Sequence, residues 1–184
     1  MALTSGSYGI GPDNGRLLLH TSRQGVAAKA GHDLTIEATR WSGVADVDVD
    51  RPDASHLTVS VEVAGLEVRE GTGGVKPLTD KDRADIKRLI NDKILVSERS
   101  PTIEFSSTDV SRDEVRGELA IAGQRRPALL RLTIDESTST VTARAMVLQS
   151  EYGIKPYTGF FGALKVADAV DVEAQVTLIQ PTGT

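Results

Sequence analysis

The sequence of 184 residues lacks cysteine, has few aromatic residues and contains no long hydrophobic run. The absence of cysteine excludes a disulfide-stabilised scaffold, a cysteine-ligated zinc module and a thiol enzyme. No run of about 18 apolar residues occurs, which excludes a membrane-spanning helix. Because aromatic residues make up only 4% of the chain, the core must be built mainly from valine, leucine, isoleucine and alanine.

Basic residues are also too few for general nucleic-acid binding. The formal net charge is −5, so there is no surplus of lysine and arginine to displace counterions from a phosphate backbone. The first residues show neither the basic part nor the apolar part of a secretory signal, and we expect a cytoplasmic location. The length is that of one large domain, and we predict a single domain over residues 1–184.

Alternation of apolar and polar residues is the dominant pattern in the chain, and it predicts strands. In Asp33–Trp41 the side chains of Leu34, Ile36 and Ala38 share one face, and Gly43 is predicted to mark a bend after this segment. The clearest alternation predicts one continuous strand over residues 56–68. The other predicted strands are residues 16–23, 44–50, 102–110, 114–123, 127–135, 140–149 and 169–179.

One segment has the pattern of an amphipathic helix instead. It runs from about Thr79 to Ile94, with Thr79 as N-cap and Asp82 three residues later. Its apolar stripe consists of Ile86, Leu89, Ile90 and Ile94. About eight antiparallel strands with one inserted helix predict an all-β fold, either a closed barrel or a sandwich of two sheets.

No cofactor or metal site is predicted from the residue pattern. The three histidines, His20, His32 and His56, are far apart and none has a metal-ligand spacing. The glycine-rich residues 70–77 lack the phosphate-loop pattern and predict a flexible, lid-like connection between strand and helix. His32 precedes Asp33 at the start of a strand, where the carboxylate could orient the imidazole; the alternative is that both satisfy a tight turn.

The aromatic residues are unevenly distributed. Four of the seven lie within one segment of 16 residues that also contains three glycines. These four are Tyr152, Tyr157, Phe160 and Phe161. They predict either an apolar plug at one end of a barrel or the rim of a binding pocket.

The order of several short motifs resembles the YceI-like family. Tyr8–Asp13 has the form Y-x-I-x-P-D, Pro101–Phe105 the form P-x-I-x-F, and Gly117–Gly123 the form G-x-L-x-I-x-G. Tyr-Gly-Ile at residue 152 and the final strand Val170–Val176 complete the series. The resemblance implies an extended, lipocalin-like antiparallel β-barrel with one helix, and binding of long apolar molecules, such as polyisoprenoid chains or fatty lipids, inside it.

The first functional hypothesis is therefore non-enzymatic binding or carriage of an isoprenoid or fatty ligand. The residues predicted to contact it are His32, Leu34, Phe105, Tyr152, Tyr157, Phe160, Phe161 and Leu164. The alternative is a barrel enzyme for a small apolar substrate, with His32 as general acid or base assisted by Asp33 or Tyr152. A third hypothesis is a structural module that forms a homodimer through its outer strands.

Overall fold

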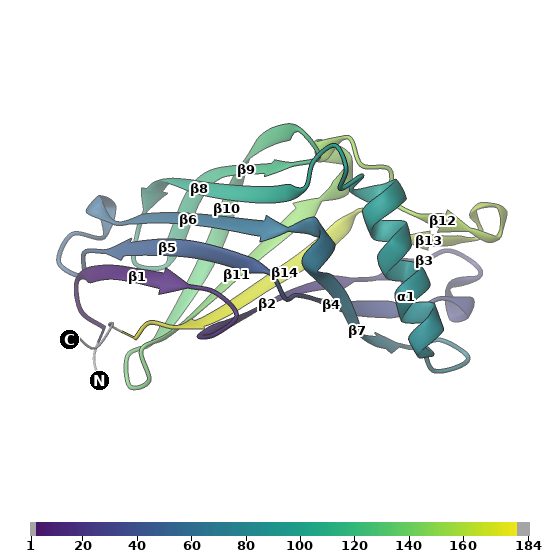
Figure 1. The fold of residues 1–184 in the computed structure, drawn as a ribbon, viewed down its shortest axis with the longest axis horizontal. Coiled ribbons are helices and arrows are strands. Elements are labelled where there is room, and N and C mark those ends of the chain that lie inside the picture. The colour runs from purple at the N-terminus through teal and green to yellow at the C-terminus, as the bar shows by residue number, and fades with distance from the viewer. Residues whose placement is uncertain (1–2, 180–184) are drawn as a thin grey trace.

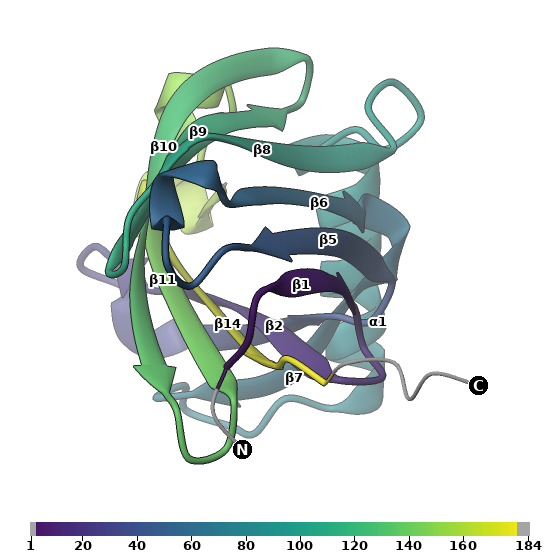
Figure 2. The ribbon, with the colours of Figure 1, turned by 90° about the vertical axis from the view of Figure 1, so that its left-hand side faces the viewer.

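Most of the strands belong to one strongly curled antiparallel sheet in the computed structural model, which describes residues 3–179 (Figures 1 and 2). Its strands are β1 (Gly6–Ile10), β2 (Gly15–Thr21), β4 (Asp33–Ala38), β5 (Trp41–Val47), β6 (His56–Glu62), β7 (Leu66–Thr72), β8 (Thr102–Val110), β9 (Glu114–Ile121), β10 (Gln124–Asp135), β11 (Thr140–Leu148) and β14 (Ala169–Thr177). The spatial order is β1-β5-β6-β8-β9-β10-β11-β14-β2-β4-β7. The predicted all-β antiparallel fold is confirmed.

A second, small sheet lies at one end of the barrel (Figure 1). It consists of β12 (Thr158–Gly159), β13 (Leu164–Val166) and β3 (Arg23–Gln24). The α-helix α1 (Asp80–Leu89) lies at the same end, which we call the helix end. The opposite end, with the turns that follow β5, β8 and β10, we call the hairpin end.

A bent two-stranded ribbon gives the barrel its corner. The pair β4 and β7 continues into the pair β5 and β6, so one hairpin contributes strands near both edges of the sheet. At the bend, the main-chain N–H and the hydroxyl of Thr39 both donate to the carbonyl of Gly65, at 2.9 and 2.8 Å. These bonds satisfy main-chain groups that leave the ladder at the corner.

This corner corrects two predictions. The strand predicted over residues 56–68 is wrong beyond Glu62, because a 3-10 turn at Val63–Gly65 divides it into β6 and β7. The bend before β5 lies at residues 39 and 40, whereas Gly43 lies inside β5. A Cβ on Gly43 would lie 2.4 Å from the carbonyl oxygen of Thr58, so close strand packing explains this glycine.

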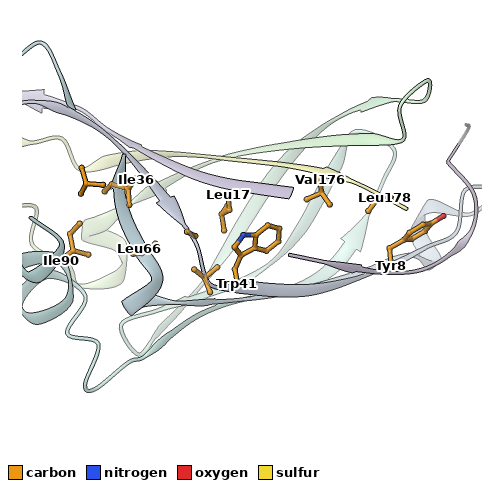
Figure 3. Close-up of a cluster of buried hydrophobic side chains, with 11 residues drawn as sticks. Tyr8, Leu17, Ile36, Trp41, Leu66, Ile90, Val176 and Leu178 are labelled. Carbon is orange, nitrogen blue, oxygen red and sulfur yellow. The ribbon is translucent and has the colours of Figure 1, made fainter. Parts of the chain in front are cut away.

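Apolar side chains close the seam between the edge strand β1 and the strands β2 and β14 (Figure 3). Tyr8 from β1 and Trp41 from β5 belong to the same buried cluster as Leu17 from β2 and Val176 from β14. The Asn14 side-chain amide bridges the seam, since it donates to the carbonyls of Gly9 and Thr177. The curled sheet is thus closed by packing as well as by hydrogen bonds.

The predicted helix forms as α1, followed directly by a π-helical turn at Ile90–Ile94. Thr79 and Asp82 form a reciprocal capping box at its start. The Lys87 side chain forms an ion pair with Glu67 of β7, which holds the helix against the sheet edge. Ile86 and Ile90 pack into the main core cluster, so the predicted apolar stripe faces inward.

Candidate functional site

A long apolar cavity of about 680 Å³ runs through the barrel. Figure 2 looks along the long axis of the molecule, with the strands arranged around this interior. On β10 alone, the lining side chains extend from Ala128 to Ile134, a distance of about 20 Å at the usual rise per strand residue. A cavity of this volume lies within the range of small-molecule binding sites.

Aliphatic side chains make up most of the wall. Alternate residues along each strand face inward, and the lining set includes Leu17, Leu19, Ile36, Val59, Ile103, Leu119, Leu130, Leu132, Val141, Val172 and Val176. Ala143 of β11 and Ala174 of β14 lie directly opposite each other and both line the cavity. Two methyl groups at this position leave space that larger side chains would occupy.

The few aromatic residues in the wall have specific surroundings. The ring of Phe105 lies over Gly117, because a Cβ on Gly117 would lie 2.6 Å from its Cζ. Trp41, the single tryptophan of the chain, also lines the cavity. Its indole N–H is buried and has no hydrogen-bond partner among residues 3–179.

Most polar lining residues lie at the two ends of the cavity. Thr21, Arg23, His32, Gln149 and Lys165 are at the helix end, and Asp48, Ser55, His56, Ser111, Arg112 and Glu136 are at the hairpin end. The middle of the cavity is bounded mainly by hydrocarbon. The site therefore suits a molecule with a long apolar chain, whose polar part would lie at one end.

His32 lines the cavity at the helix end and is bonded to the neighbouring loop. One ring nitrogen, Nε2, lies 2.6 Å from the main-chain carbonyl oxygen of Lys76. A Cβ on Gly74 would lie 2.2 Å from the same nitrogen, so the glycine lets residues 73–77 fold over the ring. This loop belongs to the glycine-rich connection of residues 70–77, whose role as a flexible lid stays a prediction.

Asp33 interacts with Arg23 rather than with the His32 imidazole. Its Oδ1 accepts a hydrogen bond of 2.8 Å from the main-chain N–H of Arg23 and lies 3.9 Å from the guanidinium Nε. The Arg23 guanidinium donates to the carbonyl of Gly31 at 2.9 Å. His32 and Asp33 therefore both bind main-chain groups, but of residues far from them in the chain rather than of one tight turn.

Tyr152 does not line the cavity; it is buried in a second cluster behind the wall, with Ile121 and Ile154, which do line it. Burial raises the pKa of its phenol above the ordinary value, and the charge of Glu151 adds to this effect. No hydrogen bond joins Tyr152 to His32 in the part of the chain that the structure describes. Of the two groups that the enzyme hypothesis offers to assist His32, Asp33 or Tyr152, the tyrosine is thus not among the residues that line the cavity with the histidine.

The remaining predicted ligand contacts fall into two groups. Leu34, Phe105, Tyr157 and Leu164 line the cavity together with His32. Phe160 and Phe161 do not: their side chains lie outside the wall, with relative exposures of 63% and 111%. The segment that contains them does reach the helix end of the cavity, through Tyr157 and Leu164.

Sequence reasoning missed several residues of the site. Arg23 and the inward residues of β10, β11 and β14 line the cavity, although only the alternation of their strands signals them. The alternation shows that one face of each strand is apolar. A face that packs into a solid core and a face that lines a cavity produce the same pattern. The apolar stripe of α1 likewise does not show whether its side chains pack into a solid core or line a cavity.

Among residues 3–179, no group of three or more histidine, aspartate or glutamate side chains is arranged to hold a metal ion. Within the same residues, no helix has the length and apolar character needed to cross a membrane.

Comparisons with known proteins agree with this architecture. The family described as YceI-like domain matches residues 18–178. The crystal structure of BcnA from Burkholderia cenocepacia superposes with a TM-score of 0.65 and 14% identity, over 88% of this chain and 94% of that one. A polyisoprenoid binding domain from Saccharophagus degradans, implicated in plant cell wall breakdown, superposes with a TM-score of 0.58 and 10% identity, over 94% and 97%. No curated protein sequence matches the chain significantly.

Proposed function

The chain belongs to the family of YceI-like domains, and on this basis we propose that it binds a polyisoprenoid or fatty chain inside its barrel, as a carrier rather than as a catalyst. The observation that carries the proposal is the cavity of about 680 Å³ with an aliphatic wall. Transfer of apolar surface from water into such a wall contributes about 25 cal/mol per Å². One solved structure with this fold is named as a polyisoprenoid binding domain.

The surroundings of His32 support a role in carrying a ligand rather than in catalysis. The hydrogen bond described for His32 is to a main-chain carbonyl, which holds the ring in place but cannot relay a proton as a second titratable side chain would. We assign the apolar contacts to Leu34, Phe105, Tyr157 and Leu164, and a polar contact at the helix end to His32.

The direct test is to extract the purified full chain with organic solvent and to analyse the extract by mass spectrometry. A second measurement titrates the protein with geranylgeraniol and with palmitate, and follows the fluorescence of Trp41. Because this tryptophan lines the cavity, a bound chain changes the polarity around its indole. Absence of a bound lipid and of a fluorescence change would count against the proposal.

An Ala143→Phe/Ala174→Phe variant tests whether the ligand occupies the cavity. Two rings in the middle of the wall should weaken binding of the isoprenoid at least about tenfold, by filling its space. The unfolding free energy should change by less than about 1 kcal/mol, because the rings enter an empty volume. The matched control is Thr142→Phe, next to Ala143 on β11 but not in the cavity wall. Unchanged affinity in the double variant would place the ligand elsewhere.

A further inference from the structure

Large apolar side chains are exposed together at the helix end. They are Val26, Val75, Phe160 and Phe161, with relative exposures of 98%, 78%, 63% and 111%. They come from three loops, residues 25–30, 72–78 and 159–164, which all lie at this end of the molecule (Figure 1). We call the surface formed by these four side chains the apical tip.

Direct contacts join the three loops. The main-chain N–H of Ala27 donates to the carbonyl of Ala163 at 3.0 Å, which ties the first loop to the third. The Arg23 guanidinium donates to the carbonyl of Thr72 at 3.4 Å, and a Cβ on Gly73 would lie 2.0 Å from the same guanidinium. The three loops that carry the apolar side chains are therefore connected, two of them directly and the third through Arg23 of β3.

The fold itself does not explain the two phenylalanines. Phe160 and Phe161 have φ angles of 48° and 55°, in the left-handed region that glycine and asparagine adopt far more readily than bulky residues. Their rings are exposed, so they pack in neither buried cluster, and they do not line the cavity. Glycine or asparagine would make the same turn more easily.

The segments that form the tip contain more basic than acidic residues, although the chain as a whole carries a net charge of −5; Asp33, just outside these segments, pairs with Arg23. Residues 22–31 and 153–167 contain four cationic residues, Arg23, Lys29, Lys155 and Lys165, and no acidic residue. The loop of residues 72–78 adds Lys76, also without an acidic residue. The four lysines are exposed, and they lie in or next to the loops that carry the exposed apolar side chains.

The tip is continuous with the cavity. Tyr157 and Leu164, on either side of Phe160 and Phe161 in the chain, line the cavity wall at this end, and so does Lys165. His32 joins the wall to the loop that carries Val75, through its bond to Lys76. A surface against the tip would therefore lie directly over this end of the cavity.

We propose that the apical tip docks on an anionic lipid bilayer, with Phe160, Phe161, Val26 and Val75 inserted among the headgroups. Apolar side chains bind at the boundary of headgroups and acyl chains, and neighbouring lysines are attracted to anionic lipids. Docking needs no cargo in the cavity, so the proposal goes beyond ligand binding. It supplies the surface at which an apolar chain could pass between bilayer and barrel without crossing water.

The test measures co-sedimentation of the full chain with vesicles of phosphatidylcholine, with and without phosphatidylglycerol. The wild type should bind the anionic vesicles more tightly, and added salt should weaken this binding. A Phe160→Ser/Phe161→Ser variant should bind about tenfold more weakly or worse, since it loses the apolar insertion. The matched control is Leu129→Ser/Met146→Ser, which removes two exposed apolar side chains from β10 and β11 and should bind like the wild type.

A second pair of variants tests the charge. Each lysine that leaves the surface should weaken binding to anionic vesicles about fivefold, so Lys29→Glu/Lys165→Glu should bind far less tightly. Arg51→Glu/Arg131→Glu changes the net charge equally, on residues 74% and 73% exposed elsewhere on the molecule, and should lose much less. Thermal unfolding checks that every variant is folded.

Two results would overturn the docking proposal: no binding of the wild type to anionic vesicles, or equal binding by the tip variants and their controls. The first result would mean that the apical tip binds an acceptor protein instead of a bilayer. The Trp41 titration separates this proposal from ligand binding. If the protein docks on vesicles but shows no fluorescence change, only the proposal of ligand binding is refuted. If the fluorescence changes but the protein does not dock, only the proposal of membrane docking is refuted.

Discussion

Single polar side chains on the outside of the barrel connect neighbouring strands, and Glu37 shows how. It lies on β4 between Arg69 of β7, whose Nε is 2.6 Å from Oε2, and Arg16 of β2, whose Nε is 3.2 Å from Oε1. The hydrogen bond from Arg69 is the main cause that holds the pKa of the Glu37 carboxyl below its ordinary value, and Arg16 adds to it. The carboxylate is thus bonded on both sides.

This arrangement predicts a pH dependence of stability. A carboxyl whose pKa is lower in the folded state contributes stability above its unfolded pKa, and loses it as the pH falls through the folded pKa. The unfolding free energy should therefore decrease as the pH falls below about 5. In Glu37→Gln, and to a lesser extent in Arg69→Ala, chemical denaturation should show a shallower decrease. Slopes identical to that of the wild type in both variants would contradict the assignment.

At the scale of elements, the start of α1 depends on one hydroxyl. Thr79 Oγ1 accepts from the main-chain N–H of Asp82 at 3.2 Å, and the Asp82 carboxylate accepts from the N–H of Thr79 at 2.9 Å. This second bond is the main cause that holds the pKa of Asp82 below its ordinary value. Because Ile86, Leu89 and Ile90 line the cavity, the stability of α1 also determines how the helix end is covered.

A Thr79→Ala substitution should destabilise the start of the helix by about 1 kcal/mol, the usual effect of losing an N-cap hydroxyl. Hydrogen exchange of the amides in α1 should become about fivefold faster by the same free energy. The control is Thr79→Ser, which keeps the accepting oxygen and should exchange nearly as slowly as the wild type. Equal exchange in Thr79→Ala and Thr79→Ser would show that the cap has no effect on helix opening.

At the scale of the whole molecule, the sheet is closed where its edge strand β1 approaches β2 and β14. Asn14 donates from Nδ2 to the carbonyls of Gly9 and Thr177, at 3.0 and 3.2 Å, and its Oδ1 accepts from the N–H of Gly11 at 2.9 Å. The buried cluster around Trp41 lies beneath this seam. One amide therefore satisfies main-chain groups on both sides of the gap.

An Asn14→Ala substitution should lower the unfolding free energy by about 1–3 kcal/mol, because partly buried main-chain groups lose their partners. Asp13→Ala, an exposed position in the same turn, should change it by less than about 0.5 kcal/mol. Chemical denaturation followed by Trp41 fluorescence measures both. A stability loss in Asn14→Ala no larger than that in Asp13→Ala would mean that packing alone closes the seam.

Much of the fold could be predicted because its signals are local. The strand predicted at residues 102–110 coincides with β8, and the helix begins at the predicted N-cap Thr79. Alternation and capping depend on residues a few positions apart, so they can be read along the chain. Of the site, Leu34, Phe105, Tyr157, Leu164 and His32 line the cavity, whereas Tyr152 packs elsewhere and the phenylalanines lie outside. Nothing local distinguishes a ring that faces the cavity from one that faces solvent.

Local sequence patterns are enough to specify an antiparallel β structure with one capped helix and an aliphatic inward face. Three features emerge only in the folded chain: residues 56–72 bend at Val63–Gly65, the inward face surrounds an open cavity, and Phe160 and Phe161 lie outside it. These features depend on contacts between residues far apart in the chain, such as Thr39 with Gly65 and Asn14 with Thr177. Whether an apolar face packs solid or stays open depends on the space between all the strands, which no single segment specifies.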